Sequence, residues 1–156
     1  LLNRTTSMSR KWFDNKVPIN NEITSESKLE CLAKTSVENY INKFNTYKLD
    51  QAANEVLNLA INTNLYLNEN QPWSLIKEND KLPVVQEIIY NVLESTRIIG
   101  LLLLPLLPEL SSKINLQLGS IYQKDVSWEQ QLKWGLLISN TTLPKPSPII
   151  NKLEYE

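Results

Sequence analysis

The chain has 156 residues, of which 42% are hydrophobic and 21% charged, a composition typical of one globular domain. Sixteen basic and 17 acidic residues give a net charge of -1, which excludes the strongly positive field on which non-specific nucleic-acid binding depends. Histidine is absent and cysteine occurs once, which argues against zinc sites and against a cysteine nucleophile activated by histidine.

The first two predicted helices occupy residues 1–13 and 28–47. In the first, apolar and small residues follow one stripe, and the helix is expected to begin upstream of Leu1 in a longer protein. A capping box made by Ser27 and Glu30 predicts the start of the second, which should end near Tyr47. The residues expected to face inward are Leu29, Leu32, Ala33, Val37, Tyr40, Ile41 and Phe44.

A third helix is predicted from Leu49 to about Asn68, because apolar residues continue at helical spacing. Pro72 ends this helix, since proline lacks a backbone donor, and the same proline can open a short helix over residues 73–77. Trp73 therefore lies at a corner of the chain. The inward residues are Ala52, Ala53, Val56, Leu59, Ala60 and Leu67.

The most apolar helix is predicted to begin at residues 80–83, where Pro83 suits a first turn, and to end or bend at Pro105. It should be the central and most buried helix. A further helix is expected over residues 109–118, closed by Gly119. The inward residues of the central helix are Val84, Val85, Ile88, Ile89, Val92, Leu93, Thr96, Ile99 and Gly100.

Beyond Gly119 the chain becomes polar, and prolines at 144, 146 and 148 predict an extended stretch over residues 141–150. The predicted fold is therefore all-α, a bundle of about five helices with an extended Pro-rich C-terminal tail. We expect the bundle to occupy residues 1–119. The tail, residues 120–156, should pack on this bundle or on another domain of the same polypeptide.

Single residues and short runs bear on the compartment of the protein and on contact with membranes. Cys31 lies among apolar residues and is expected to be a reduced core thiol in a cytosol-like compartment, hence a cytoplasmic location. The apolar run at residues 98–107 is about half the ~20 residues that a membrane-spanning helix needs, so it is interpreted as buried core. The N-terminus shows no signal-peptide pattern, and the chain is expected to be an excised fragment.

Catalytic and nucleotide-binding patterns are not expected within this chain. The acidic residues are expected to lie scattered over solvated helix faces, and three glycines cannot form a phosphate-cradling loop or a dinucleotide fingerprint. Asn3, Arg4 and Trp73 are suited to unstacked bases, because indole stacks and guanidinium or amide groups bond base edges. Pattern alone favours a different interpretation, with Trp73 as a core aromatic and Arg4 as a solvated charge.

Several motifs follow one another along the chain, namely LLNRT at residues 1–5, RKWFD at 10–14, YLNENQPWSLIK at 66–77, YNVLESTRII at 90–99, LPLLPE at 104–109 and WG at 134–135. In this order they resemble the C-terminal domain of bacterial-type methionyl-tRNA synthetases, and the resemblance covers nearly the whole chain. It changes the interpretation of Trp73 and Arg4 in favour of RNA contact.

The resemblance implies a helical class I synthetase domain that recognises the methionine anticodon CAU of tRNA(Met). Trp73 would stack on an anticodon base and Arg4 would bond a base edge, with Asn3 and Pro72 in support. An asparagine one turn before Arg4 also contacts the anticodon in the family, and it would lie just upstream of Leu1. Where many members have an aspartate thought to repel wrong anticodons, this chain has Asn68, which is neutral and both donates and accepts.

Catalysis is expected from another domain of the same polypeptide. The resemblance implies a parent methionine–tRNA ligase that uses ATP with magnesium, whereas this chain holds no catalytic residue, metal site or cofactor. One alternative is a helical protein-interaction module that docks a partner through its Pro-rich tail and exposed aromatics, without RNA. Another concerns the tail alone, which from Trp128 onward could pack on the parent's catalytic domain.

Overall fold

The computed structural model describes residues 1–19, 27–120, 122–147 and 149. Across these ranges the chain is helical, and the β pairing in them is one isolated bridge between Lys16 and Thr142. This confirms the all-α prediction, with five helices of ten residues or more. The elements are α1 (Leu2–Trp12), α2 (Lys28–Asn45), α3 (Leu49–Asn70), α4 (Pro72–Leu75), the 3-10 helix η1 (Asn79–Lys81), α5 (Leu82–Leu103), α6 (Pro108–Gln117) and α7 (Trp128–Gln131).

Local sequence signals explain where the helices start and stop. The Ser27 hydroxyl accepts a hydrogen bond from the Glu30 amide at 3.1 Å, which satisfies one of the unpaired donors at the start of α2. Helices α4, α5 and α6 each carry a proline in their first or second position, where a missing N–H costs nothing. Gly119, just past α6, has φ +63°, a left-handed conformation that glycine adopts without strain.

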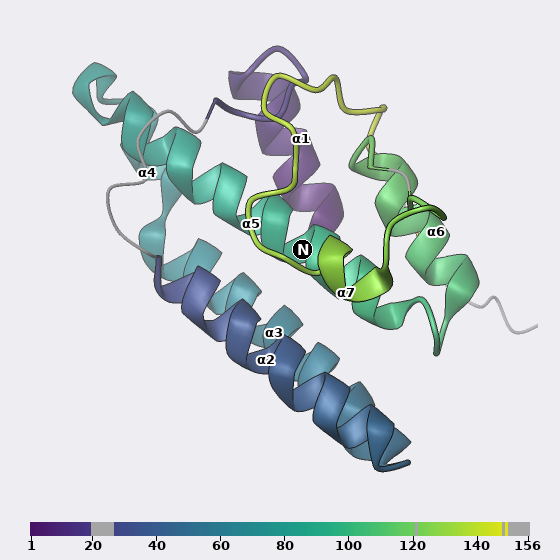
Figure 1. The fold of residues 1–156 in the computed structure, drawn as a ribbon. Helices are drawn as coiled ribbons and strands as arrows, with labels where there is room; N and C mark the ends of the chain where they lie inside the picture. The colour runs from purple at the N-terminus through teal and green to yellow at the C-terminus, as the bar shows by residue number, and fades with distance from the viewer. Residues whose placement is uncertain (20–26, 121, 148, 150–156) are drawn as a thin grey trace, which may run out of the picture.

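Helix α5 is the centre of the bundle, as predicted. It contacts α1, α2, α3, α4 and α6, and its residues 88–102 are buried on every face. Figure 1 shows α2 and α3 paired on one side of α5, with α1 and α6 on the other. A Cβ atom added at Gly100 would lie 2.9 Å from Cγ2 of Ile114, so this glycine allows α6 to approach α5 closely.

Several residues that were predicted to be buried are exposed. Cys31 is exposed, because it lies two residues, or about 200°, from Leu29, which faces the core. Ala53 is also exposed on α3. Val84 is 43% exposed in the first turn of α5, and Leu107 is 51% exposed at the corner before α6. The fully buried part of the apolar run therefore ends at residue 102.

Residues 128–143, here called the C-terminal segment, pack on the bundle. Helix α7, which the sequence analysis did not predict, contacts it through Trp128. This indole ring lies 5.8 Å from the Tyr40 ring between centroids, and its N–H donates to the Leu101 carbonyl at 3.0 Å. Further along, the buried residues are Gln131, Leu132, Leu137 and Leu143.

The extended stretch expected over residues 141–150 is described only in part, because Pro148 and Ile150 lie outside the described residues. Its residues 141–147 form no helix. The division between bundle and tail at residue 119 stays a prediction.

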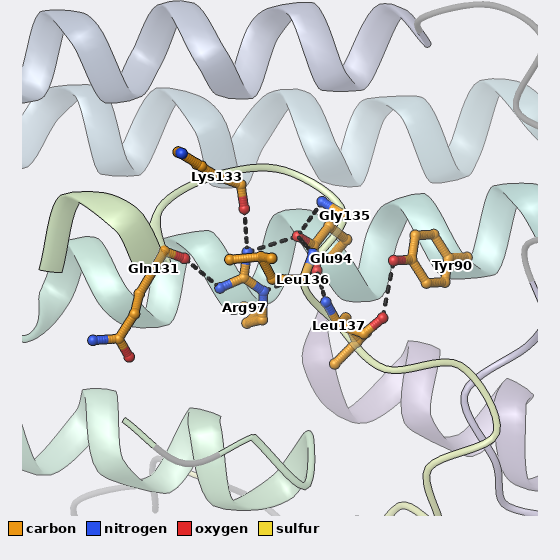
Figure 2. Close-up of polar contacts among 8 residues, drawn as sticks. All are labelled: Tyr90, Glu94, Arg97, Gln131, Lys133, Gly135, Leu136 and Leu137. Atoms are coloured by element: carbon orange, nitrogen blue, oxygen red, sulfur yellow. Dashed lines mark hydrogen bonds and ion pairs between the residues drawn. The ribbon is translucent and has the colours of Figure 1, made fainter. Parts of the chain in front are cut away.

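A buried ion pair on α5 fixes the C-terminal segment (Figure 2). Arg97 donates two hydrogen bonds to the carboxylate of Glu94, at 2.9 and 2.6 Å, and two more to the carbonyls of Gln131 and Lys133. The Glu94 carboxylate also accepts three backbone N–H bonds from residues 135–137, at 2.7 to 3.0 Å. Both side chains are almost fully buried, so every bond replaces one to water.

The same segment is tied to the chain that follows α1. The Val17 N–H donates to the Thr141 carbonyl at 2.9 Å, and the Asn140 N–H donates to the Val17 carbonyl at 2.9 Å. A third bond, from the Leu143 N–H to the Asn15 carbonyl, is 2.7 Å long. Helix α1 is therefore held both by α5 and by the C-terminal segment. Among the helices that the structure describes, none is long and apolar enough to cross a membrane.

Candidate nucleic-acid interface

Arg4 and Trp73 lie together on the surface, although 69 positions separate them in the chain. The guanidinium carbon of Arg4 lies 4.6 Å from the centroid of the Trp73 ring, in a cation–π arrangement. Arg4 also donates from Nη1 to Oδ1 of Asn68 at 2.8 Å. These three side chains come from α1, α4 and the last turn of α3, so the bundle brings them to one place.

The chain between α3 and α4 explains why Trp73 is available. Gln71 adopts a left-handed conformation, with φ 44° and ψ 55°, and reverses the chain after Asn70. Pro72 then opens α4 and is itself buried, while Trp73 is half-buried against a cluster of buried apolar residues that includes Leu67 and Ile89. The indole is thus anchored on one side and reaches the surface on the other.

The remaining predicted site residue, Asn3, precedes Arg4 on α1 and is exposed. Its carbonyl accepts hydrogen bonds from the hydroxyls of Thr6 and Ser7. Within the described part of the chain its side-chain amide bonds to no other residue, so both its donor and its acceptor face solvent. The structure therefore brings Arg4, Asn68 and Trp73 into direct contact, and it places Asn3 and Pro72 next to them in the chain.

This arrangement suits the binding of an unstacked base. A guanidinium has five N–H donors, and the bond to Asn68 uses one of them. An exposed cation–π contact is worth about 0.5–1 kcal/mol, whereas stacking of a base on an aromatic ring is worth about 1–3 kcal/mol. A base that displaces Arg4 from the indole face therefore gains more than is lost, and the released guanidinium can bond the base edge.

Sequence reasoning missed the buried pair of Glu94 and Arg97. The interpretation that the acidic residues lie on solvated faces is wrong for Glu94, whose exposed fraction is 0%. The available signal was an acid and a base three residues apart inside an otherwise apolar helix, where neither charge can reach water alone. In residues 1–19, 27–120, 122–147 and 149, no three His, Cys, Asp or Glu side chains gather closely enough to hold a metal ion.

A comparison with protein families identifies this architecture. The family described as the anticodon binding domain of methionyl tRNA ligase matches residues 17–155. The chain belongs to this family. Two relatives are methionine–tRNA ligases. That of Listeria monocytogenes serotype 4b is 31% identical over 100% of this chain and 24% of its own length. That of Thermosynechococcus vestitus is 34% identical over 98% of this chain and 30% of its own length.

Solved structures of the family agree in fold. The apo form of Mycobacterium tuberculosis methionyl-tRNA synthetase superposes with a TM-score of 0.87 at 24% identity, covering 99% of this chain and 31% of that protein. The same enzyme in complex with methionyl-adenylate gives a TM-score of 0.78 at 23% identity, over 97% and 30%. At these identities the likeness concerns the fold. The chain spans less than a third of the length of the relatives that it matches.

Proposed function

We propose that this chain recognises the CAU anticodon of tRNA(Met), with Trp73 stacking on one anticodon base and Arg4 bonding a base edge. The observation that carries the proposal is the Arg4 guanidinium over the Trp73 ring at 4.6 Å, on the surface of a domain of this family. Asn3 and Pro72 support these two residues. Recognition here depends on stacking and hydrogen bonds to loop bases, which a chain of net charge -1 can provide.

Asn68 contributes a donor in this proposal. Its Oδ1 accepts from Arg4, so its amide nitrogen is left to donate to an acceptor on a base edge. A carboxylate at this position would offer acceptors alone. The amide therefore favours bases that present oxygen or ring-nitrogen acceptors, where an aspartate would repel them.

The protein containing this chain is proposed to be a methionine–tRNA ligase that works in the cytoplasm. Its relatives carry that name and are three to four times longer than this chain. Attachment of methionine to tRNA, with ATP and magnesium, would take place in a catalytic domain of the same polypeptide. The chain described here would supply binding energy for tRNA and would select the correct tRNA.

Replacing Trp73 tests the proposal in the full-length protein. Trp73→Ala is expected to weaken binding of a CAU anticodon hairpin by about 1–3 kcal/mol, or roughly 5- to 150-fold, because one stacking platform is lost. Trp73→Phe is the matched control, since it keeps an aromatic face and should lose less. Binding is measured by gel shift with the CAU hairpin and with a hairpin of altered loop. Equal affinity of the wild-type protein for both hairpins would refute the proposal.

A helical protein-interaction module remains the second candidate, and one surface favours it. Leu57, Ile61 and Leu65 form a stripe on α3 at intervals of four residues, with exposed fractions of 57%, 57% and 48%. The same gel shift separates the two functions, because a module of this kind would not distinguish CAU from another loop.

A further inference from the structure

The positive charge of the chain is concentrated at its N-terminal end. Residues 1–19 contain four basic residues and one acidic residue, whereas residues 20–156 contain 12 basic and 16 acidic residues. The net charge of -1 therefore hides a segment of +3 and a remainder of -4. Such asymmetry indicates a local anionic partner even where the whole chain is close to neutral. The basic residues are Arg4, Arg10, Lys11 and Lys16.

Three of these residues lie on the solvent side of α1. Arg4, Arg10 and Lys11 are exposed, while Leu2, Thr5 and Ser9 on the opposite side are buried. Seven residues make almost two complete helical turns, so Lys11 lies within about 20° of Arg4 around the axis and about 10.5 Å further along it. Ser7, between them, has a small side chain that bonds to its own helix. Arg10 and Asn3 lie about 20° apart around the axis and about 100° from Lys11 and Arg4, at the other edge of the exposed side.

Neither Arg10 nor Lys11 is neutralised by the part of the protein that the structure describes. Other cations have carboxylate partners, namely Lys34 with Glu30, Lys43 with Glu55, Lys81 with Asp80 and Arg97 with Glu94. No such pair is formed by Arg10 or Lys11 among the described residues. Asp14, the single acid of residues 1–19, lies past the end of the helix.

We infer that this face of α1 binds the phosphodiester backbone of the RNA, with Lys11 as the main contact and Arg10 beside it. The inference rests on the proposed function, because it takes the base on Trp73 and Arg4 as the fixed point. From there Lys11 lies about 10.5 Å further along α1, a distance that a single strand spans in a few nucleotides. Lys11 therefore meets the sugar–phosphate strand next to the bases that Arg4 and Trp73 hold.

The salt dependence of binding tests this contact in the full-length protein. Each phosphate contact with a single strand contributes about -0.7 to the slope of log affinity against log salt concentration. Lys11→Gln is expected to make the slope about 0.7 less negative and to weaken binding about fivefold at 0.1 M salt. Both effects should be equal for the CAU hairpin and for the hairpin of altered loop. Arg10→Gln combined with Lys11→Gln should reduce the slope by up to about 1.4.

Lys48→Gln is the matched control, because it removes one exposed charge just before α3, about 30 Å along that helix from Asn68. It should leave the slope unchanged. A slope for Lys11→Gln equal to that of the wild type would overturn the inference. That result leaves the proposed function intact, since discrimination between CAU and the altered loop by the wild-type protein tests it separately. Thermal unfolding of each variant checks that these exposed substitutions preserve the fold.

Discussion

Replacing Glu94 by alanine should destabilise the whole domain. The carboxylate is fully buried and accepts two hydrogen bonds from Arg97 and three from the backbone of residues 135–137. Without it, Arg97 is left charged and 3% exposed, with only two carbonyl partners. The cost of a buried pair that loses one member is about 3–5 kcal/mol, mainly because the remaining charge is uncompensated.

This magnitude is a large part of the stability of an ordinary domain, about 5–15 kcal/mol. For a chain of this length each kcal/mol lowers Tm by roughly 2–4 °C, so a decrease of about 6–20 °C is expected. Urea unfolding followed by circular dichroism gives the free energy of unfolding directly. Glu129→Ala is the control, because it removes an exposed carboxylate from the neighbouring helix α7 and should change stability by less than about 0.5 kcal/mol.

The double variant Glu94→Ala with Arg97→Met separates the two parts of this cost. Removing both charges eliminates the uncompensated guanidinium, so the double variant should lose less than the two single variants together. A loss below about 1 kcal/mol for Glu94→Ala, or strictly additive losses, would show that the pair does not hold the C-terminal segment as described.

Two further predictions concern stability. Gly100→Ala should lower the free energy of unfolding in urea, because the added Cβ lies 2.9 Å from Ile114. The cost of overpacking, about 1–3 kcal/mol, exceeds the gain in helix propensity of roughly 0.5–1 kcal/mol. A stabilised variant would contradict the close approach of α5 and α6. Burial raises the pKa of Tyr40 and of Tyr90 from 10.0 to about 12. The free energy of unfolding should therefore keep its full value below pH 10 and decrease as the pH rises toward 12. A urea midpoint that stays constant over this interval would count against the burial of these two residues.

Much of the fold was predictable because its signals are local. The capping box at Ser27, the prolines that open α4, α5 and α6, and Gly119 after α6 act within one turn of the residues that they organise. Periodicity failed where a helix is covered on all sides or where one turn extends beyond its neighbours. Glu94 and Val84, both on α5, are examples.

The candidate site required information that spacing does not contain. Nothing in the local sequence brings Arg4 to Trp73, since the contact depends on how α1 and α4 both pack on α5. The resemblance to the family selected these residues, and the geometry then placed them within 4.6 Å. The alignment of Lys11 with Arg4 was available from helical periodicity but has a function only once their common face is known to be exposed.

The bonds between Val17 and residues 140–141 set an order of events during synthesis. Residue 17 leaves the ribosome before its partners, which follow more than 120 positions later. At about 5–20 residues per second this delay is roughly 6–25 s. Throughout that interval α1 lacks its last attachment, so it takes its final position only when translation of the C-terminal segment is complete.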